Sequence, residues 1–208
     1  MRLILASDMS FLLKHGYALT GIPDDQMRVG YVTTASKGAR DQAFFQRIKD
    51  LMQEKKIPFE EIDIEGKSKD ELLSFFKDKN IIHIEGGNTF YLLRAIKENN
   101  FAEVLKELLY QGKVYIGTSA GAYIMCPSIE VSNWDKSGRD RFGLSDFSAL
   151  QYVPFLLKVH YNDEKESEVR ENIKAIKYPI RILRDGEGLL CENGECKFIG
   201  DAKETILI

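Results

Sequence analysis

Short apolar segments alternate with helical segments along most of this 208-residue chain. The segments with strand character are residues 3–6, 28–33, 59–64, 81–84, 114–116, 155–160 and 180–183. Segments with helical spacing of apolar residues include 39–55, 89–97, 101–111 and 164–176, and Ser68 and Glu71 have the spacing of a capping box. Strands joined by helices pair in parallel through right-handed crossovers. We therefore predict a three-layer α/β/α sandwich with a mainly parallel, flavodoxin-like sheet.

The rest of the pattern limits the number of domains and the kinds of partner. Residues 189–191, 197–199 and 205–208 are predicted to be antiparallel strands at the sheet edge, and no repeat or linker divides the chain, so residues 1–208 are expected to form one domain. A net charge of −3 offers no basic surface for nucleic acid or an anionic membrane. The first apolar run stops at Ser7-Asp8, and no run reaches the roughly 18 residues of a membrane span. We expect a cytoplasmic protein.

The cysteines do not suggest a metal site or a disulfide framework. The chain has three cysteines and three histidines, and none of them cluster at metal-ligand spacing, so no metal or cofactor is expected. Cys191 and Cys196 flank an Asn193-Gly194 turn and would face each other across a hairpin. In a cytoplasmic chain we expect them to be reduced thiols.

One motif points to nucleophilic chemistry. Gly117-Thr118-Ser119-Ala120-Gly121 directly follows a predicted strand and precedes a helix-compatible segment. Strand, Gly-x-Ser-x-Gly and helix is the context of a nucleophile elbow, in which small residues permit a sharp turn and the helix N-terminus favours a developing oxyanion. Ser119 is therefore the candidate nucleophile of a hydrolase. The alternative is a tight turn in which Ser119 only caps the helix.

A serine nucleophile needs a base, and the histidines differ in their positions. His15 lies in a helical stretch and is expected to pack or to face solvent, and His83 lies inside a strand and is expected in the core. His160 ends a strand, and the carboxyl ends of parallel strands are where α/β active sites gather, so His160 is the predicted base. The carboxylate that would orient it stays open between Asp185, Glu187 and Asp135.

A second glycine-rich turn could supply an oxyanion donor. Glu85-Gly86-Gly87-Asn88-Thr89 follows a strand and opens a helix, and its two glycines would let the backbone approach a ligand. A phosphate-binding loop is the competing interpretation. The turn lacks both the Gly-x-Gly-x-x-Gly pattern and a P-loop lysine, so nucleotide binding is not favoured.

These motifs together resemble the dipeptidase E and cyanophycinase family of serine peptidases. The resemblance rests on Ile84-Glu85-Gly86-Gly87-Asn88-Thr89, Gly117-Thr118-Ser119-Ala120-Gly121-Ala122, Cys126-Pro127-Ser128-Ile129, Gly143-Leu144, His160-Tyr161 and Asp185-Gly186, in the family's order. It implies a class I glutamine amidotransferase-like sheet. It also implies a Ser–His–acid triad that hydrolyses small peptides through an acyl-enzyme.

The resemblance also assigns roles to single residues. It implies Ser119 as nucleophile, His160 as base and Asp185 as acid. The backbone N–H groups of Gly87 and Ala120 would form the oxyanion hole. The secondary candidates are Glu187, Asp135 and Asn88, and the expected state is a monomer or homodimer.

The substrate side chain is less defined. Aspartyl dipeptidases of this family carry an arginine in the loop after the histidine, whereas residues 162–168 here are mostly acidic and the nearest arginine, Arg170, is predicted on the next helix. Such a rim would disfavour an aspartyl side chain. Two alternative functions remain, an α/β-hydrolase esterase with Asp135 as its acid and a ligand-binding relative without catalysis.

Overall fold

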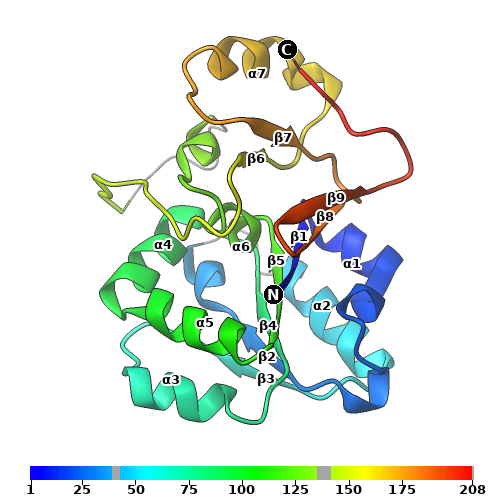
Figure 1. The fold of residues 1–208 in the computed structure, drawn as a ribbon, viewed down its shortest axis with the longest axis vertical. Coiled ribbons are helices and arrows are strands. Elements are labelled where there is room, and N and C mark those ends of the chain that lie inside the picture. The colour runs from blue at the N-terminus through cyan, green and yellow to red at the C-terminus, as the bar shows by residue number, and fades with distance from the viewer. Residues whose placement is uncertain (39–42, 135–141, 208) are drawn as a thin grey trace.

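The chain forms one large sheet covered by helices on both faces. The computed structural model describes residues 1–38, 43–134 and 142–207, and these form a seven-stranded sheet in the order β3-β2-β4-β5-β1-β8-β9 (Figure 1). Its strands are β1 (Arg2–Ala6), β2 (Val29–Val32), β3 (Phe59–Ile62), β4 (Ile81–Ile84), β5 (Val114–Thr118), β8 (Gly188–Glu192) and β9 (Glu195–Ile199). Strands β3, β2, β4, β5 and β1 run parallel, while β8 and β9 complete the sheet in antiparallel pairing.

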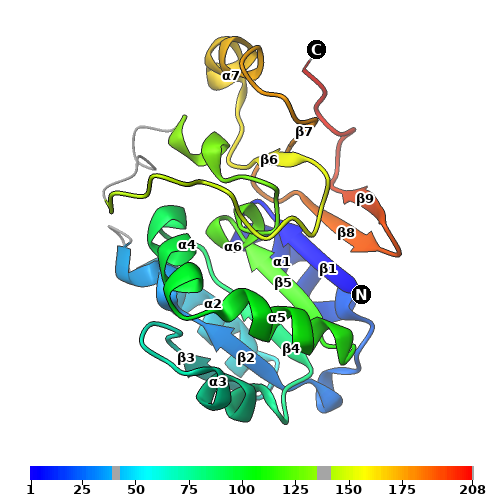
Figure 2. The ribbon, with the colours of Figure 1, turned by 60° about the vertical axis from the view of Figure 1, so that its left-hand side comes forward.

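The helices lie in two layers, one on each side of the sheet. They are α1 (Met9–His15), α2 (Ala43–Glu54), α3 (Lys69–Phe76), α4 (Thr89–Glu98), α5 (Phe101–Tyr110) and α6 (Ala120–Tyr123), with 3₁₀ segments at Gly16–Thr20, Asp24–Gln26, Thr34–Gly38 and Glu130–Asn133. Figures 1 and 2 show α1 and α2 on one face and α3, α4 and α5 on the other. Strand β1 serves both cores, because Leu3 and Leu5 join the cluster under α4 and α5 while Ile4 and Ala6 join the cluster with α1. The predicted three-layer α/β/α sandwich is confirmed.

Helix α3 begins where the sequence predicts. The Ser68 side chain accepts the Glu71 N–H, and the Glu71 carboxylate accepts the Ser68 N–H at 2.8 Å. This reciprocal capping box satisfies two backbone donors at the helix start.

Two predicted strands do not join the main sheet. Strands β6 (Leu156–Lys158) and β7 (Ile180–Ile182) pair in parallel as a separate two-stranded sheet, linked by a 3₁₀ turn (Asp163–Lys165) and α7 (Glu166–Ile173). Figure 2 shows this small sheet above the carboxyl edge of the main one. In the main sheet β8 lies beside β1, and β6 and β7 pair with each other.

The edge strand predicted at residues 205–208 does not extend the main sheet in the residues that the structure describes. Thr205 makes a single antiparallel bridge to Ile182 of the small sheet, and Leu207 packs against the cluster that includes Tyr161. The end of the chain therefore covers the small sheet rather than extending the main one, and position 208 lies outside the described residues.

The expectation of reduced thiols is wrong for the pair at the β8–β9 hairpin. Cys191 and Cys196 stand directly opposite each other in the ladder and form a disulfide. Cys126 is a free, buried thiol. The Asn193-Gly194 turn indicates a tight hairpin, and the resulting cross-strand proximity of the two cysteines is the sequence feature that points to the disulfide.

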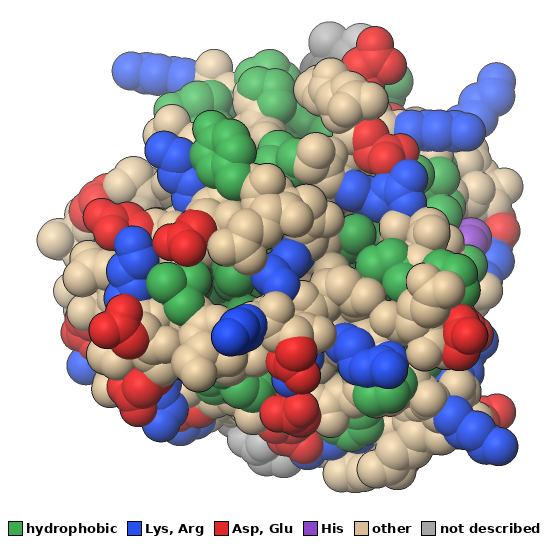
Figure 3. Space-filling view, turned by 60° about the horizontal axis from the view of Figure 1, so that its bottom comes forward, with side chains coloured by type: hydrophobic (Ala, Val, Ile, Leu, Met, Phe, Trp, Pro, Cys, Tyr) green, Lys and Arg blue, Asp and Glu red, His purple; other side chains and the backbone are tan. Residues whose placement is uncertain are grey.

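The surface carries both signs of charge. On the face drawn in Figure 3, acidic and basic side chains of the described residues are interspersed. None of the helices in the described part of the chain has the length and apolar character of a membrane span.

His83 is a core residue, as predicted. It lies in β4 with no solvent exposure, its Nδ1 is 2.9 Å from the Tyr17 hydroxyl, and the edge of the Tyr31 ring packs against it. Burial lowers the pKa of His83 from 6.5 to about 3, because the charged imidazolium would lose its hydration. His15, at the end of α1, packs against the ring of Phe11.

The buried imidazole predicts a specific loss of stability in acid. Below pH 6.5 the unfolded chain binds a proton at His83 that the folded chain does not bind until about pH 3, so folding stability falls as the pH is lowered through that interval. Between these pH values the free energy of unfolding falls by about 1.4 kcal/mol per pH unit because of this one proton. Urea unfolding of the wild type and of His83→Gln between pH 7.5 and pH 4 should show a shallower decline in the variant. If the free energy of unfolding declined equally with falling pH in both proteins, His83 would not be the cause of the loss.

Candidate active site

The backbone makes a sharp turn at Ser119, between β5 and α6. Ser119 has φ 48° and ψ −104°, a conformation that side-chain-bearing residues rarely adopt, and its N–H donates to the Ala6 carbonyl at 3.0 Å. The flanking glycines are sterically required. A Cβ on Gly117 would lie 2.4 Å from the Gly121 carbonyl oxygen, and one on Gly121 would lie 2.2 Å from that of Ile84. The chain thus follows the strand–turn–helix path that the sequence predicts.

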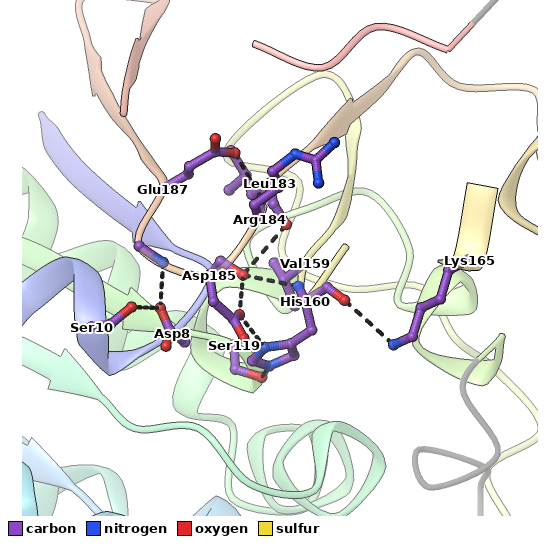
Figure 4. Close-up of polar contacts among 12 residues, drawn as sticks. Asp8, Ser10, Ser119, Val159, His160, Lys165, Leu183, Arg184, Asp185 and Glu187 are labelled. Atoms are coloured by element: carbon purple, nitrogen blue, oxygen red, sulfur yellow. Dashed lines mark hydrogen bonds and ion pairs between the residues drawn. The ribbon is translucent and has the colours of Figure 1, made fainter. Parts of the chain in front are cut away.

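Three of the predicted site residues form a hydrogen-bonded chain (Figure 4). Ser119 Oγ is 2.9 Å from His160 Nε2, and His160 Nδ1 is 2.7 Å from Asp185 Oδ1. His160 follows β6 and Asp185 follows β7, so the small sheet carries both of them to the turn at Ser119. The hydrogen bond from His160 lowers the pKa of Asp185 and favours its carboxylate form, although partial burial opposes this.

The other candidate acids are arranged differently. The Glu187 carboxylate accepts the backbone N–H of Arg184 at 2.7 Å and points away from the imidazole (Figure 4). Asp135 lies outside the described residues. Of the two candidates that the structure describes, Asp185 contacts His160.

The Gly86-Gly87 turn lies at the same edge of the sheet as Ser119. Ile84 pairs with Gly117, so the ends of the neighbouring strands β4 and β5 emerge together. Gly87 has φ 131°, and a Cβ there would lie 2.3 Å from the Ala35 carbonyl oxygen, so the position requires glycine. Ala120 is the first residue of α6, and its N–H has no intrahelical acceptor.

Asn88 has a local structural contact. Its side chain accepts the Tyr91 N–H at 2.9 Å and caps α4, and its own N–H donates to the Ala35 carbonyl at 2.9 Å. These bonds fix the start of α4 and hold the Gly87 turn against the Ala35 backbone.

Ser7 is a site residue that the sequence did not reveal. It follows β1 directly and is fully buried; its Oγ accepts the His160 N–H at 2.9 Å and lies 3.2 Å from Asp185 Oδ1. It therefore holds the backbone of His160, whose φ is +54°, and donates to Asp185 Oδ1, the same carboxylate oxygen that His160 Nδ1 contacts. The available signal was its position, since a polar residue at the carboxyl end of a strand beside β5 faces the Ser119 turn.

Asp8, the next residue, reinforces the same edge. Its Oδ1 accepts the Gly186 N–H at 2.8 Å and the Ser10 hydroxyl at 2.7 Å. The loop that carries Asp185 is thereby tied to the segment between β1 and α1.

Several acidic residues after His160 lie beside cationic side chains in the structure. Arg170 lies on α7, as predicted, and forms an ion pair with Glu166 at 2.8 Å. Arg184 pairs with Asp163, and the Lys165 ammonium points toward the site, 3.3 Å from the His160 carbonyl oxygen (Figure 4). The expected acidic rim is therefore partly neutralised by cations.

Metal binding has no evident location in the described part of the chain. No group of three or more His, Cys, Asp or Glu side chains there is arranged to hold an ion.

Known proteins resemble this chain in both sequence and structure. The model of Peptidase family S51 matches residues 12–199. An uncharacterised peptidase of Listeria monocytogenes is 30% identical over 158 residues, 73% of this chain and 77% of the relative. Peptidase E of a Nostoc species is 24% identical over 184 residues, 84% of this chain and 73% of the relative. A crystal structure of a Listeria monocytogenes protein, described provisionally as a peptidase E, matches with a TM-score of 0.82 at 26% identity, covering 97% of this chain and 98% of that one.

The fold and these relatives together identify an enzyme that hydrolyses peptide bonds. The chain belongs to peptidase family S51. The resemblance to peptidase E that the sequence motifs suggest is thus confirmed.

The close approach at Gly87 predicts an intolerance to any side chain. Gly87→Ala places a methyl group against the Ala35 backbone at an unfavourable φ, so it should lower the free energy of unfolding by more than about 2 kcal/mol. Gly66→Ala is the matched control, because Gly66 also has a positive φ (72°) but nothing lies within 4 Å of an added Cβ. Urea denaturation should give the control a loss of about 1 kcal/mol, the cost of placing a Cβ in the left-handed conformation. Equal losses in the two variants would contradict the steric argument.

Proposed function

We propose that the chain is a serine-type peptidase that hydrolyses small peptides, with Ser119 as nucleophile, His160 as general base and Asp185 as the orienting acid. The observation that supports this most directly is the hydrogen-bonded chain from Ser119 Oγ to His160 Nε2 and from His160 Nδ1 to Asp185. Nucleophile, base and orienting group within hydrogen-bond reach form the arrangement that nucleophilic catalysis by serine requires.

In the first half-reaction Ser119 forms an acyl-enzyme. His160 Nε2 takes the hydroxyl proton as Ser119 Oγ bonds to the peptide carbonyl carbon, and the carbonyl electron pair moves to oxygen. The N–H groups of Gly87 and Ala120 are the proposed donors to that oxyanion. His160 then gives the proton to the leaving amine as the C–N bond breaks.

In the second half-reaction water replaces the amine. His160 removes a proton from the water as its oxygen attacks the acyl carbon, and it returns the proton to Ser119 Oγ when the ester bond breaks. Asp185 would keep the proton of neutral His160 on Nδ1, so that Nε2 faces Ser119 as an acceptor. The lowered pKa of Asp185 suits this role, because the group has to be ionised while the base works.

The proposed substrates are small peptides, in keeping with the relatives named peptidase E. The charges beside His160 would influence which substrate side chains the site accepts. Because Lys165 stands among acidic residues that are partly paired, the site does not favour one sign of charge as strongly as the sequence suggests.

Removing the nucleophile tests the proposal. Ser119→Ala should lower the turnover of dipeptides by roughly 10³-fold or more, because the remaining groups cannot form the acyl-enzyme. The assay uses dipeptides with acidic, neutral and basic N-terminal residues, and a fluorophosphonate probe should label the wild type but not the variant. Full activity in Ser119→Ala, with its unfolding curve unchanged, would refute the proposal.

A second pair of variants identifies the acid. Asp185→Asn should reduce kcat on the order of 10³-fold, because an amide can turn its NH₂ toward Nδ1 and favour the wrong histidine tautomer. Glu187→Gln is the matched control. It keeps an oxygen that can accept the Arg184 N–H, so its kcat should stay within about threefold of the wild type. The reverse order of defects would assign the acid to Glu187.

A further inference from the structure

Glu85 is a buried carboxylate that the proposed mechanism does not use. It follows β4 directly and has no solvent exposure, and its partners among the described residues are neutral. It accepts hydrogen bonds from the Tyr31 hydroxyl, from the Gly86 N–H at 2.7 Å and from the Thr118 hydroxyl at 3.0 Å. Burying a carboxylate without a cation is costly unless several donors satisfy it. An arrangement of this kind at a strand end points to a role that an apolar side chain could not fill.

The partners of Glu85 lie next to the proposed oxyanion donors. Gly86 immediately precedes Gly87, and Thr118 immediately precedes Ser119 and Ala120. The Gly86 N–H also lies 3.1 Å from Thr118 Oγ1, so the carboxylate, the hydroxyl and the amide form a closed triangle. This triangle joins the carboxyl ends of β4 and β5.

The triangle lies beyond the end of the ladder between β4 and β5. The last ladder partners of β4 and β5 are Ile84 and Gly117, and beyond them each strand continues into its own turn. Oxyanion donors are effective only if they converge on one oxygen, at about 2.7–3.1 Å from each. A link after the end of the ladder would hold the two turns at the required separation.

We propose that Glu85 is a positioning residue of the oxyanion site, which sets the Gly87 turn relative to the Ser119–Ala120 turn through Gly86 and Thr118. The inference rests on the proposed function, since it assumes that Gly87 and Ala120 bind the oxyanion. Glu85 acts through its geometry rather than its charge, because a negative charge near a developing oxyanion opposes it.

Two substitutions separate geometry from charge. Glu85→Gln removes the charge but keeps an oxygen that can accept from Gly86 and Thr118, while its NH₂ can donate to the Tyr31 oxygen. Glu85→Ala removes every link. Thr118→Val breaks the triangle from the opposite side, at a fully buried position, and carries the test if Glu85→Ala does not fold.

The control has to lose buried hydrogen bonds far from the site. Thr20→Val does so, because Thr20 is buried and its hydroxyl donates to the Tyr17 carbonyl and accepts the Ile22 N–H, both close to it in the chain. Each variant is examined for urea unfolding, for kcat and KM on a dipeptide, and for inhibition by a peptide aldehyde, whose hemiacetal oxygen occupies the oxyanion site.

We expect Glu85→Ala to lower kcat by roughly 10- to 100-fold with little change in KM, and to weaken aldehyde binding by a similar factor. Thr118→Val should show a smaller loss of the same kind, and Glu85→Gln should recover most of the activity lost in Glu85→Ala. Thr20→Val should lose stability alone.

Two results would overturn the inference. One is a loss of stability in Glu85→Ala or Thr118→Val with kcat and aldehyde affinity as in Thr20→Val. The other is Glu85→Gln as impaired as Glu85→Ala, which would assign the effect to charge. If instead the wild type reacts with neither the fluorophosphonate nor the aldehyde, the proposed function itself fails.

Discussion

Strand β1 is the element on which the site depends. It lies where the parallel and antiparallel parts of the sheet meet, with β5 on one side and β8 on the other. On the first side the Ala6 carbonyl accepts the N–H of Ser119, and on the second the Ser7 N–H donates to the Glu187 carbonyl at 2.9 Å. The Ser7 hydroxyl then reaches both His160 and Asp185. The end of β1 thus contacts segments that each lie more than 100 residues further along the chain.

Features that depend on neighbouring residues were readable from the sequence. The alternation of strands and helices, the capping box at Ser68 and the turn around Ser119 each involve residues a few positions apart, so their patterns survive without knowledge of the fold. His160 was identifiable because few histidines compete with it and because it follows a strand. The contact between His160 and Asp185 agrees with the assignment implied by the family resemblance, while their catalytic roles stay a proposal.

Features that depend on tertiary pairing were not readable. Nothing local distinguishes β6 and β7 from strands of the main sheet, because the difference lies in which strands pair: β8 lies beside β1, and β6 and β7 pair with each other. Ser7 is an ordinary serine in sequence and acquires its contacts only when three separate strand ends converge. The disulfide follows from the cross-strand pairing of Cys191 with Cys196, whereas the prediction of reduced thiols rests on the expected cellular environment.

The separate small sheet has a consequence for how such enzymes can diverge. The proposed nucleophile and oxyanion donors extend from the main sheet, whereas His160, Asp185 and the α7 segment between them belong to the β6–β7 unit. Residues 163–173 include Lys165 beside His160, and insertions or charge changes there would shift no register in the seven-stranded sheet, because the segment connects β6 to β7. Changes in this connecting segment can therefore accumulate while β6 and β7 keep His160 and Asp185 in place and the main sheet keeps the Ser119 turn, so that the surroundings of the site and its central geometry can evolve at different rates within one family.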